Sequence, residues 1–227
     1  MAAAVAAIAV LPYATVEAYR AYLRLDPEWR FVEEVILQPA PGGARPMVIR
    51  WTTSPRIALV NAVAEDDAFV RTVLPTLNEV LDGSGVSLRL AAAGEGDVQL
   101  YFAKRPTFER LARNFEAEPF PPVAGFHLIW PGERFDVATA VAVVSAELGD
   151  AERRAAIVHQ LLHVLGLRGD SGVFPESATF SEAERRSTAT ALAPIDRRLL
   201  RLLYMNLEPA DGWSELRTAY RRYWHAS

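Results

Sequence analysis

Two histidines, His159 and His163, lie four residues apart in an apolar segment of the C-terminal half of the chain. On an α-helix this spacing places both side chains on one face, about one turn apart. One helix can therefore offer two imidazole nitrogens to a tetrahedral metal ion such as zinc. The same spacing also arises by chance, and a pair of hydrogen-bonded histidines on the inner face of a metal-free helix is the alternative interpretation.

The helix that must carry these histidines has a start signal and a stop signal. Asp150 can cap the N-terminus, and Glu152 places negative charge in the first turn, where the helix dipole favours it. Gly166 suits the left-handed conformation that often ends a helix. We therefore predict a helix that is capped by Asp150 and ends at Gly166.

The two-histidine segment resembles the zinc-binding helix of the metzincin metallopeptidases, H-E-x-x-H-x-x-G-x-x-H. His159, His163 and Gly166 match this motif in type and spacing. Gln160 stands at the position of the general-base glutamate, and Gly169 stands at the position of the third metal ligand. The resemblance implies a zinc site built on His159 and His163.

The remaining ligand candidates lie outside the helix. Asp170 directly follows the third-ligand position and could ligate one residue out of register, or Glu176 could reach in from the next loop. An aspartate beside glycine is also a common turn residue, so a metal-free turn is the alternative for Asp170. His127 lies in an apolar strand and could face the site, although we favour a hydrogen-bonded core or edge histidine. His225 is expected to be solvated.

Gln160 decides what the site could do chemically. A glutamine can hydrogen-bond a water molecule but cannot accept its proton, and loss of a general base costs roughly 10²–10⁴-fold in rate. The resemblance therefore implies a zinc peptidase homologue in which Gln160 positions the water and hydrolysis is weak or absent. The alternative belongs to another class: a non-catalytic module that keeps the fold and binds a peptide or protein at the sheet edge.

The elements around the helix alternate between strand and helix signals from residue 47 onward, which is typical of an α/β or α+β layer. Residues 31–37 fit either a strand or a short helix, and the strand at 137–145 is too apolar for an exposed edge. Pro75 interrupts one helical pattern and could kink it. Strands are predicted at 47–51 with 57–60, 86–90, 98–102, 126–130 and 137–145, and helices at 66–81, 107–115, 194–204 and 213–224.

The string Ala193–Asp196, followed by an apolar helical pattern, resembles the closing helix of metzincins of the matrix metallopeptidase type. Metzincins place a methionine-containing turn beneath the metal, whereas this chain has Ser177–Phe180 and no methionine there. Together with the two-histidine segment, these features resemble uncharacterised bacterial metzincin-like proteins, largely exported, in which ligand and glutamate positions are often degraded. The implied fold is a single α+β, metzincin-like (zincin) domain over residues 46–227. It would contain a twisted mixed sheet, a long helix, the two-histidine helix and a C-terminal helix.

Composition excludes some partners and chemistries. The 227-residue chain has a net charge of −4 and a pI near 5.7, which give no electrostatic reason to expect nucleic acid or an anionic membrane as a partner. The absence of cysteine excludes disulfides and thiolate zinc ligands. No run reaches the ~20 apolar residues of a membrane span.

Residues 1–45 are predicted to form an N-terminal segment, because residues 39–46 are rich in proline and glycine. Residues 1–11 are alanine-rich and resemble part of a signal-peptide core, without its usual basic residues. A short buried or frayed helix is the alternative for residues 1–11, and residues 15–25 have helical spacing. With the exported relatives, this segment favours a secreted or periplasmic location.

Overall fold

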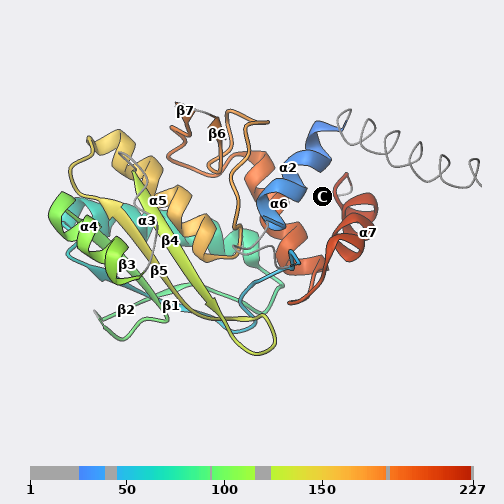
Figure 1. The fold of residues 1–227 in the computed structure, drawn as a ribbon, viewed down its shortest axis with the longest axis horizontal. Helices are drawn as coiled ribbons and strands as arrows, with labels where there is room; N and C mark the ends of the chain where they lie inside the picture. Colours follow the sequence, from blue (N-terminus) through green and yellow to red (C-terminus); the bar gives the residue numbers. More distant parts are fainter. Residues whose placement is uncertain (1–25, 39–44, 93, 116–123, 183–184, 226–227) are drawn as a thin grey trace, which may run out of the picture.

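A five-stranded sheet lies at the centre of the fold in the computed structural model, which describes residues 26–38, 45–92, 94–115, 124–182 and 185–225. The strand order is β2-β1-β3-β5-β4, and all neighbours are parallel except β4, which is antiparallel to β5 (Figure 1). The strands are β1 (Arg56–Val60), β2 (Arg89–Ala91), β3 (Val98–Ala103), β4 (Gly125–Pro131) and β5 (Val137–Ser145). The described residues therefore form a mixed α/β protein with a mainly parallel sheet.

Six helices and a short hairpin complete the described residues. The helices are α2 (Pro27–Ile36), α3 (Ala64–Leu81), α4 (Arg105–Asn114), α5 (Asp150–Val164), α6 (Pro194–Asn206) and α7 (Trp213–Tyr223), and the hairpin pairs β6 (Ser181–Glu182) with β7 (Arg185–Arg186). In Figure 1, α5 lies across the sheet, whereas α2, α6 and α7 gather at one end of the molecule. The two-histidine helix packs against β4 and β5 of the sheet and against α3.

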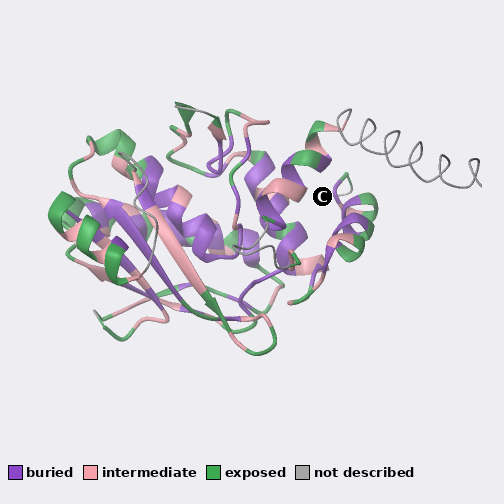
Figure 2. Cartoon of the chain, in the orientation of Figure 1, coloured by how far each residue is buried: buried purple, intermediate pink, exposed green. Residues whose placement is uncertain are grey.

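The two faces of the sheet are covered by different elements, because side chains alternate along each strand. Leu100 and Ala142 face the main core with α5, whereas Val141 and Val143 face a smaller cluster with Phe108 of α4. Burial follows this layering: α5 is mainly buried, and the outer side of α4 is exposed (Figure 2).

The C-terminal end of α5 is held by hydrogen bonds to its free carbonyls. Trp51 Nε1 donates to the carbonyl of Val164 at 2.8 Å, and the Tyr204 hydroxyl donates to the carbonyl of Leu165 at 2.8 Å. Gly166 follows with φ +103°, and a Cβ there would lie 2.2 Å from the Ile49 carbonyl oxygen. Only glycine allows both the left-handed turn and this close approach. The end of α5, and with it His163, is therefore fixed to the core.

Helix α2 belongs to the same main core as the sheet and α5. Trp29, Phe31 and Val32 are almost completely buried, and the N-terminus is capped by Asp26, whose side chain accepts from Trp29 N at 2.9 Å. Of the two alternatives predicted for residues 31–37, the helix is confirmed, because α2 extends to Ile36. The predicted division after residue 45 stays a prediction.

Several sequence predictions are confirmed. The strand 137–145 is β5, an interior strand as its apolar character indicated, and α3 continues through Pro75. Pro194 lies in the first turn of α6, and the sheet is mixed.

Other predictions were wrong in detail. Gly149, not Asp150, is the N-cap of α5, and Asp150 is the first helical residue, where it accepts from Arg153 at 2.9 Å. The strand predicted at 47–51 is reduced to one bridge between Arg50 and Asp136, and β1 begins only at Arg56.

The segments predicted at residues 1–11 and 15–25, most of the linker at 39–46 and most of the loop at 116–125 lie outside the described residues. Among the helices that the structure describes, none has the length and apolar character to cross a membrane.

Candidate metal centre

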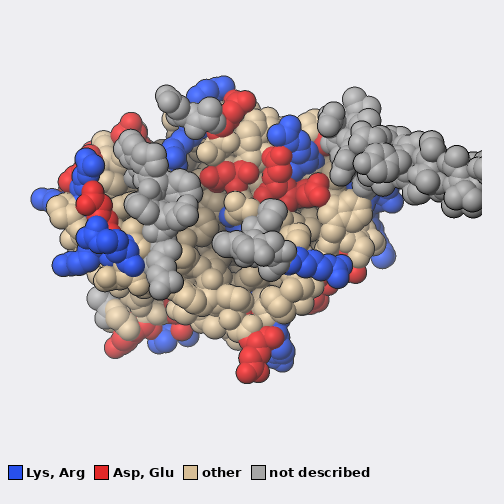
Figure 3. Space-filling model, viewed as in Figure 1, with Lys and Arg blue, Asp and Glu red and all other residues tan. Residues whose placement is uncertain are grey.

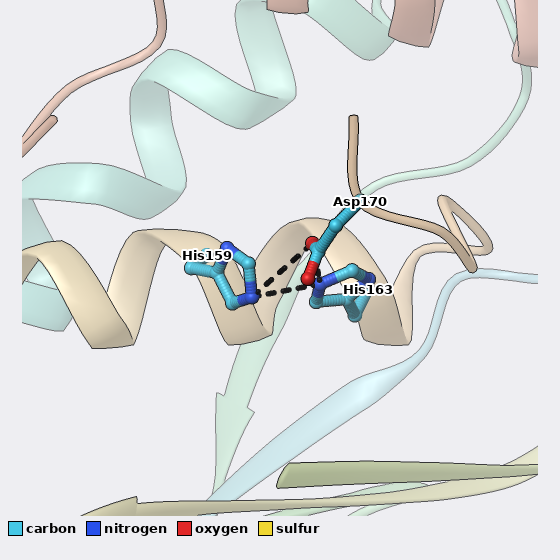
Figure 4. Close-up of side chains that lie close together, drawn as sticks. All are labelled: His159, His163 and Asp170. Carbon is cyan, nitrogen blue, oxygen red and sulfur yellow. Dashed lines mark hydrogen bonds and ion pairs between the residues drawn. The ribbon is translucent and has the colours of Figure 1, made fainter. Parts of the chain in front are cut away.

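Three side chains converge at the last turns of α5 (Figure 4). His159 and His163 project from one face of the helix, and Asp170 returns to them on the loop that follows. The two Nε2 atoms are 2.9 Å apart, and Asp170 Oδ1 lies 3.5 Å from His159 Nε2 and 3.2 Å from His163 Nε2. This cluster of two imidazoles and one carboxylate could bind a metal ion.

The outer nitrogen of each histidine is engaged by the backbone. His159 Nδ1 lies 2.7 Å from the Ala178 carbonyl oxygen, and His163 Nδ1 lies against the Leu167 carbonyl oxygen. A carbonyl only accepts, so each Nδ1 carries the proton and donates it. In the neutral rings both Nε2 atoms then present lone pairs, and these face each other at 2.9 Å. Two facing lone pairs repel unless a cation lies between them.

The three ligand atoms also have the spacing of a zinc site. Two ligands of a tetrahedral zinc ion, each at 2.0–2.1 Å, lie roughly 3.3 Å apart. The observed separations of 2.9, 3.2 and 3.5 Å bracket this value. The circle through the three atoms has a radius of about 1.9 Å, slightly less than a zinc–nitrogen bond, so one point can be within bonding distance of all three. The residues present therefore fit zinc, with a fourth position left for water or substrate.

Helix α2 packs so closely on position 169 that a side chain there cannot be accommodated, whereas Asp170 can reach the histidines. A Cβ at Gly169 would lie 2.0 Å from the carbonyl oxygen of Glu34, and Gly169 N donates to the Val35 carbonyl at 3.0 Å. Any side chain at 169 would therefore displace α2. The next residue, Ser171, donates to Glu34 Oε2 at 2.6 Å, so the loop is held to α2 on both sides of Asp170.

Burial and mutual charge set the protonation states of the cluster. Burial lowers the pKa of His159 to about 4, and the neighbouring His163 adds to the effect. For Asp170, burial alone would raise the pKa, but the hydrogen bond and charge of His163 outweigh it and lower the pKa to about 2. Near pH 7 His159 is therefore neutral and Asp170 is ionised, and these are the forms that coordinate metals.

Gln160 directly follows His159 on α5 and is buried, with 3% of its surface exposed. Its carbonyl oxygen, Oε1, makes no hydrogen bond of normal length and angle among the described residues, although Gln160 lies close enough to His127 to raise the pKa of that histidine. Oε1 can therefore still accept a hydrogen bond from a donor that enters the site. Its predicted role in positioning water stays a prediction.

His127 is the functional-site residue that the sequence analysis undervalued. It lies half-buried on β4, and its ring stacks on His163 with centroids 4.0 Å apart and planes at 12°. Burial, with the charges of His163 and His159, lowers the pKa of His127 well below its usual value. His127 is thus an edge-strand histidine, as the sequence analysis favoured, and it also faces the site, which was the alternative left open there. The alternation of side chains along a strand could not have predicted the contact with His163, because it does not indicate which face of the sheet packs against α5.

The other two candidates lie away from the cluster. Glu176 is exposed and does not belong to the ligand group found among the described residues, and His225 is 67% exposed, as predicted, near Glu28. A group of acidic side chains appears on the site-bearing face near α2 (Figure 3).

A cavity of about 430 Å³ opens beside the cluster. It lies between α5, the beginning of β4 and the segment around β6 and β7. His159 and Gln160 line one end, Ala155 and Phe180 give it apolar walls, and Arg186 adds a positive charge. The arrangement places a ligand-sized space directly next to the candidate metal ligands.

Fold and site together define a mixed α/β protein with a three-ligand candidate metal centre on helix α5 and the loop that follows it. The chain belongs to the family described as "Protein of unknown function (DUF2927)", whose model matches residues 30–209. No curated protein matches the chain.

Two solved structures of myroilysin are similar to this chain at a low level. One has a TM-score of 0.42 and 8% identity, covering 68% of this chain and 82% of the other. The second has a TM-score of 0.36 and 11% identity, covering 73% and 88%. The function proposed below rests on the site and not on these similarities.

Proposed function

We propose that this protein is a zinc-binding, metzincin-like metallopeptidase homologue whose hydrolytic activity is weak or absent. The observation that carries the proposal is the pair of Nε2 atoms of His159 and His163. Both Nδ1 atoms donate to backbone carbonyls, so in the neutral rings both Nε2 atoms present lone pairs, and these lie 2.9 Å apart beside the carboxylate of Asp170. Two imidazoles and a carboxylate, with one open position, form a catalytic rather than a structural type of zinc site.

Bound zinc would supply a Lewis acid and lower the pKa of its water to about 7. The chain contributes the remaining parts. Gln160 can orient a water molecule through its Oε1, but an amide cannot take the proton. This is the reason to expect slow turnover at best.

A peptide is the ligand that the surroundings of the site favour. β4 is the edge strand of the sheet on the side of α5, so an extended peptide could add to it as a further strand. A side chain of that peptide could then enter the cavity between Ala155 and Phe180. Export to a secreted or periplasmic location is part of this proposal, supported by the alanine-rich start of the sequence.

Gln160 also favours a second candidate, a non-catalytic peptide-binding module that keeps the zinc as a structural element or has lost it. The two candidates share the same edge strand and cavity. Zinc-dependent cleavage of a peptide, however slow, is expected only of the first candidate.

The test is metal analysis of protein purified without chelator, followed by hydrolysis assays with a mixture of fluorogenic peptides. We expect one zinc per chain, lost in His159→Ala and retained in the control His225→Ala. Absence of zinc in the folded wild-type protein would overturn the metallopeptidase proposal. Zinc without cleavage, and with peptide binding, would favour the module.

A further inference from the structure

We propose that Asp196 is a positioning residue that acts on His159 through a buried chain of hydrogen bonds. This inference rests on the proposed zinc site, because His159 is one of its ligands. It concerns the turn at residues 177–179, where the sequence lacks the methionine that the resemblance led us to look for.

The first link joins α6 to the turn. Asp196, in the first turn of α6, is fully buried, and its Oδ1 accepts from the Ser177 hydroxyl at 2.6 Å. Its Oδ2 accepts from the backbone N–H groups of Ala178 and Ala193 at 3.0 and 2.9 Å. Burial raises the pKa of Asp196 above its usual value, and the charge of Glu176 adds to this, whereas the three hydrogen bonds lower it and stabilise the carboxylate form.

The next links lead from the hydroxyl to the metal ligand. Ser177 Oγ accepts from Thr179 N at 3.1 Å. The peptide group that contains this N–H also contains the carbonyl of Ala178, and that carbonyl accepts from His159 Nδ1 at 2.7 Å. With the Ser177 proton directed to Asp196, the Thr179 hydroxyl donates to Ser177 Oγ at 3.0 Å.

All donors in this chain point from His159 toward Asp196, so each hydrogen bond polarises the next. Negative charge at Asp196 strengthens Ser177 Oγ as an acceptor, which in turn makes the Ala178 carbonyl a better acceptor for His159 Nδ1–H. A stronger bond at Nδ1 raises the basicity of Nε2, the nitrogen that faces the metal position. The chain therefore works as a carboxylate–histidine pair in which a serine and a peptide group lie between the two.

The second histidine lacks this arrangement. His163 Nδ1 donates to the Leu167 carbonyl, and no hydrogen bond given for the described residues leads from that peptide group to a carboxylate. The inference therefore predicts that Asp196 affects His159 and leaves His163 unchanged.

Asp196→Asn and Ser177→Ala test the chain separately. Each should weaken zinc binding by about tenfold, the lower end of the effect of an outer-sphere partner. The double variant should lose no more than either single variant, because both interrupt the same path. Zinc affinity is measured by competition with a chromophoric chelator, on protein shown to be folded by circular dichroism.

The control is Asp66→Asn. Asp66 is also buried, and its Oδ1 accepts from Arg153 of α5 at 2.7 Å, but among the described residues no hydrogen bond joins it to either histidine. A general loss of packing would affect this variant as well. We expect lower stability with zinc affinity unchanged.

A metal-free readout separates the chain from the zinc proposal. In the nitrogen-15 NMR spectrum, the Nδ1–H signal of His159 should move upfield in Asp196→Asn and Ser177→Ala, whereas that of His163 should not. If the wild-type protein binds no zinc but these signals move, the zinc proposal fails and the chain stands. If folded variants keep both the wild-type His159 signal and the wild-type zinc affinity, the chain is refuted.

Discussion

The candidate metal ligands and Gln160 differ in how many of their polar atoms form hydrogen bonds. On the ligand side, both Nδ1 atoms are anchored by carbonyls, and the loop with Asp170 is bonded to α2. By contrast, Gln160 Oε1 makes no hydrogen bond of normal length and angle in the described part of the chain. Under the proposed function, the histidines and Asp170 would hold the metal, whereas Gln160 could not accept a proton.

Gln160→Glu sharpens this contrast most strongly. If only the base is missing, restoring a carboxylate should raise peptide hydrolysis by roughly 10²–10⁴-fold, the usual contribution of a general base. Initial rates on fluorogenic peptides measure the effect, with the exposed Gln38→Glu as the matched control. A zinc-loaded Gln160→Glu protein that remains as slow as wild type would show that more than the base has been lost.

Asp170→Ala would break the ligand side. Removal of an outer-sphere partner already costs 10–100-fold in metal affinity, so loss of a ligand should cost more than about 100-fold. Glu176→Ala, at an exposed carboxylate outside the cluster, should leave affinity unchanged. Equal affinities of wild type and Asp170→Ala would remove Asp170 from the ligand set.

Gly169→Ala tests whether α2 sets the position of Asp170. The new Cβ would overlap the Glu34 carbonyl, and overpacking of this kind costs about 1–3 kcal/mol. Urea denaturation should show this loss together with weaker zinc binding. Gly172→Ala, in the same loop, is the control, since its new Cβ would lie 3.4 Å from the Glu182 Cβ, an ordinary contact distance. Wild-type stability in Gly169→Ala would mean that α2 does not contact the loop as described.

The pH dependence of the metal-free protein should reflect the burial of His159. Its pKa is about 4 in the folded chain and about 6.5 when unfolded, so the unfolded state binds more protons between these values. Stability is fully present above pH 6.5 and is lost as pH falls toward 4, by roughly 1–3 kcal/mol. Urea midpoints with chelator present, compared with His159→Gln, measure it. A loss of the same size in His159→Gln would assign it to other groups.

Local sequence patterns were sufficient to predict the helices and the strand that surround the site. The histidine spacing, Gly166 and Pro194 predicted α5, its end and the start of α6, because helix periodicity and termination depend on neighbouring residues. The apolar character of β5 likewise predicted an interior strand.

Features set by distant segments were not predictable. Asp170 replaces position 169 because α2 approaches Gly169, and the two segments are more than 100 residues apart in sequence. His127 reaches His163 through the pairing of β4 with β5 and the packing of α5. The hydrogen bond between Asp196 and Ser177 was not predictable either. The sequence shows only an aspartate in the first turn of a predicted helix and does not indicate its partner.

The most direct test of the account is a crystal of the protein soaked in zinc, with anomalous diffraction collected on both sides of the zinc edge. The account predicts one strong peak within bonding distance of His159 Nε2, His163 Nε2 and an Asp170 oxygen. A peak elsewhere on the protein, or two neutral histidines with no peak between them, would contradict it.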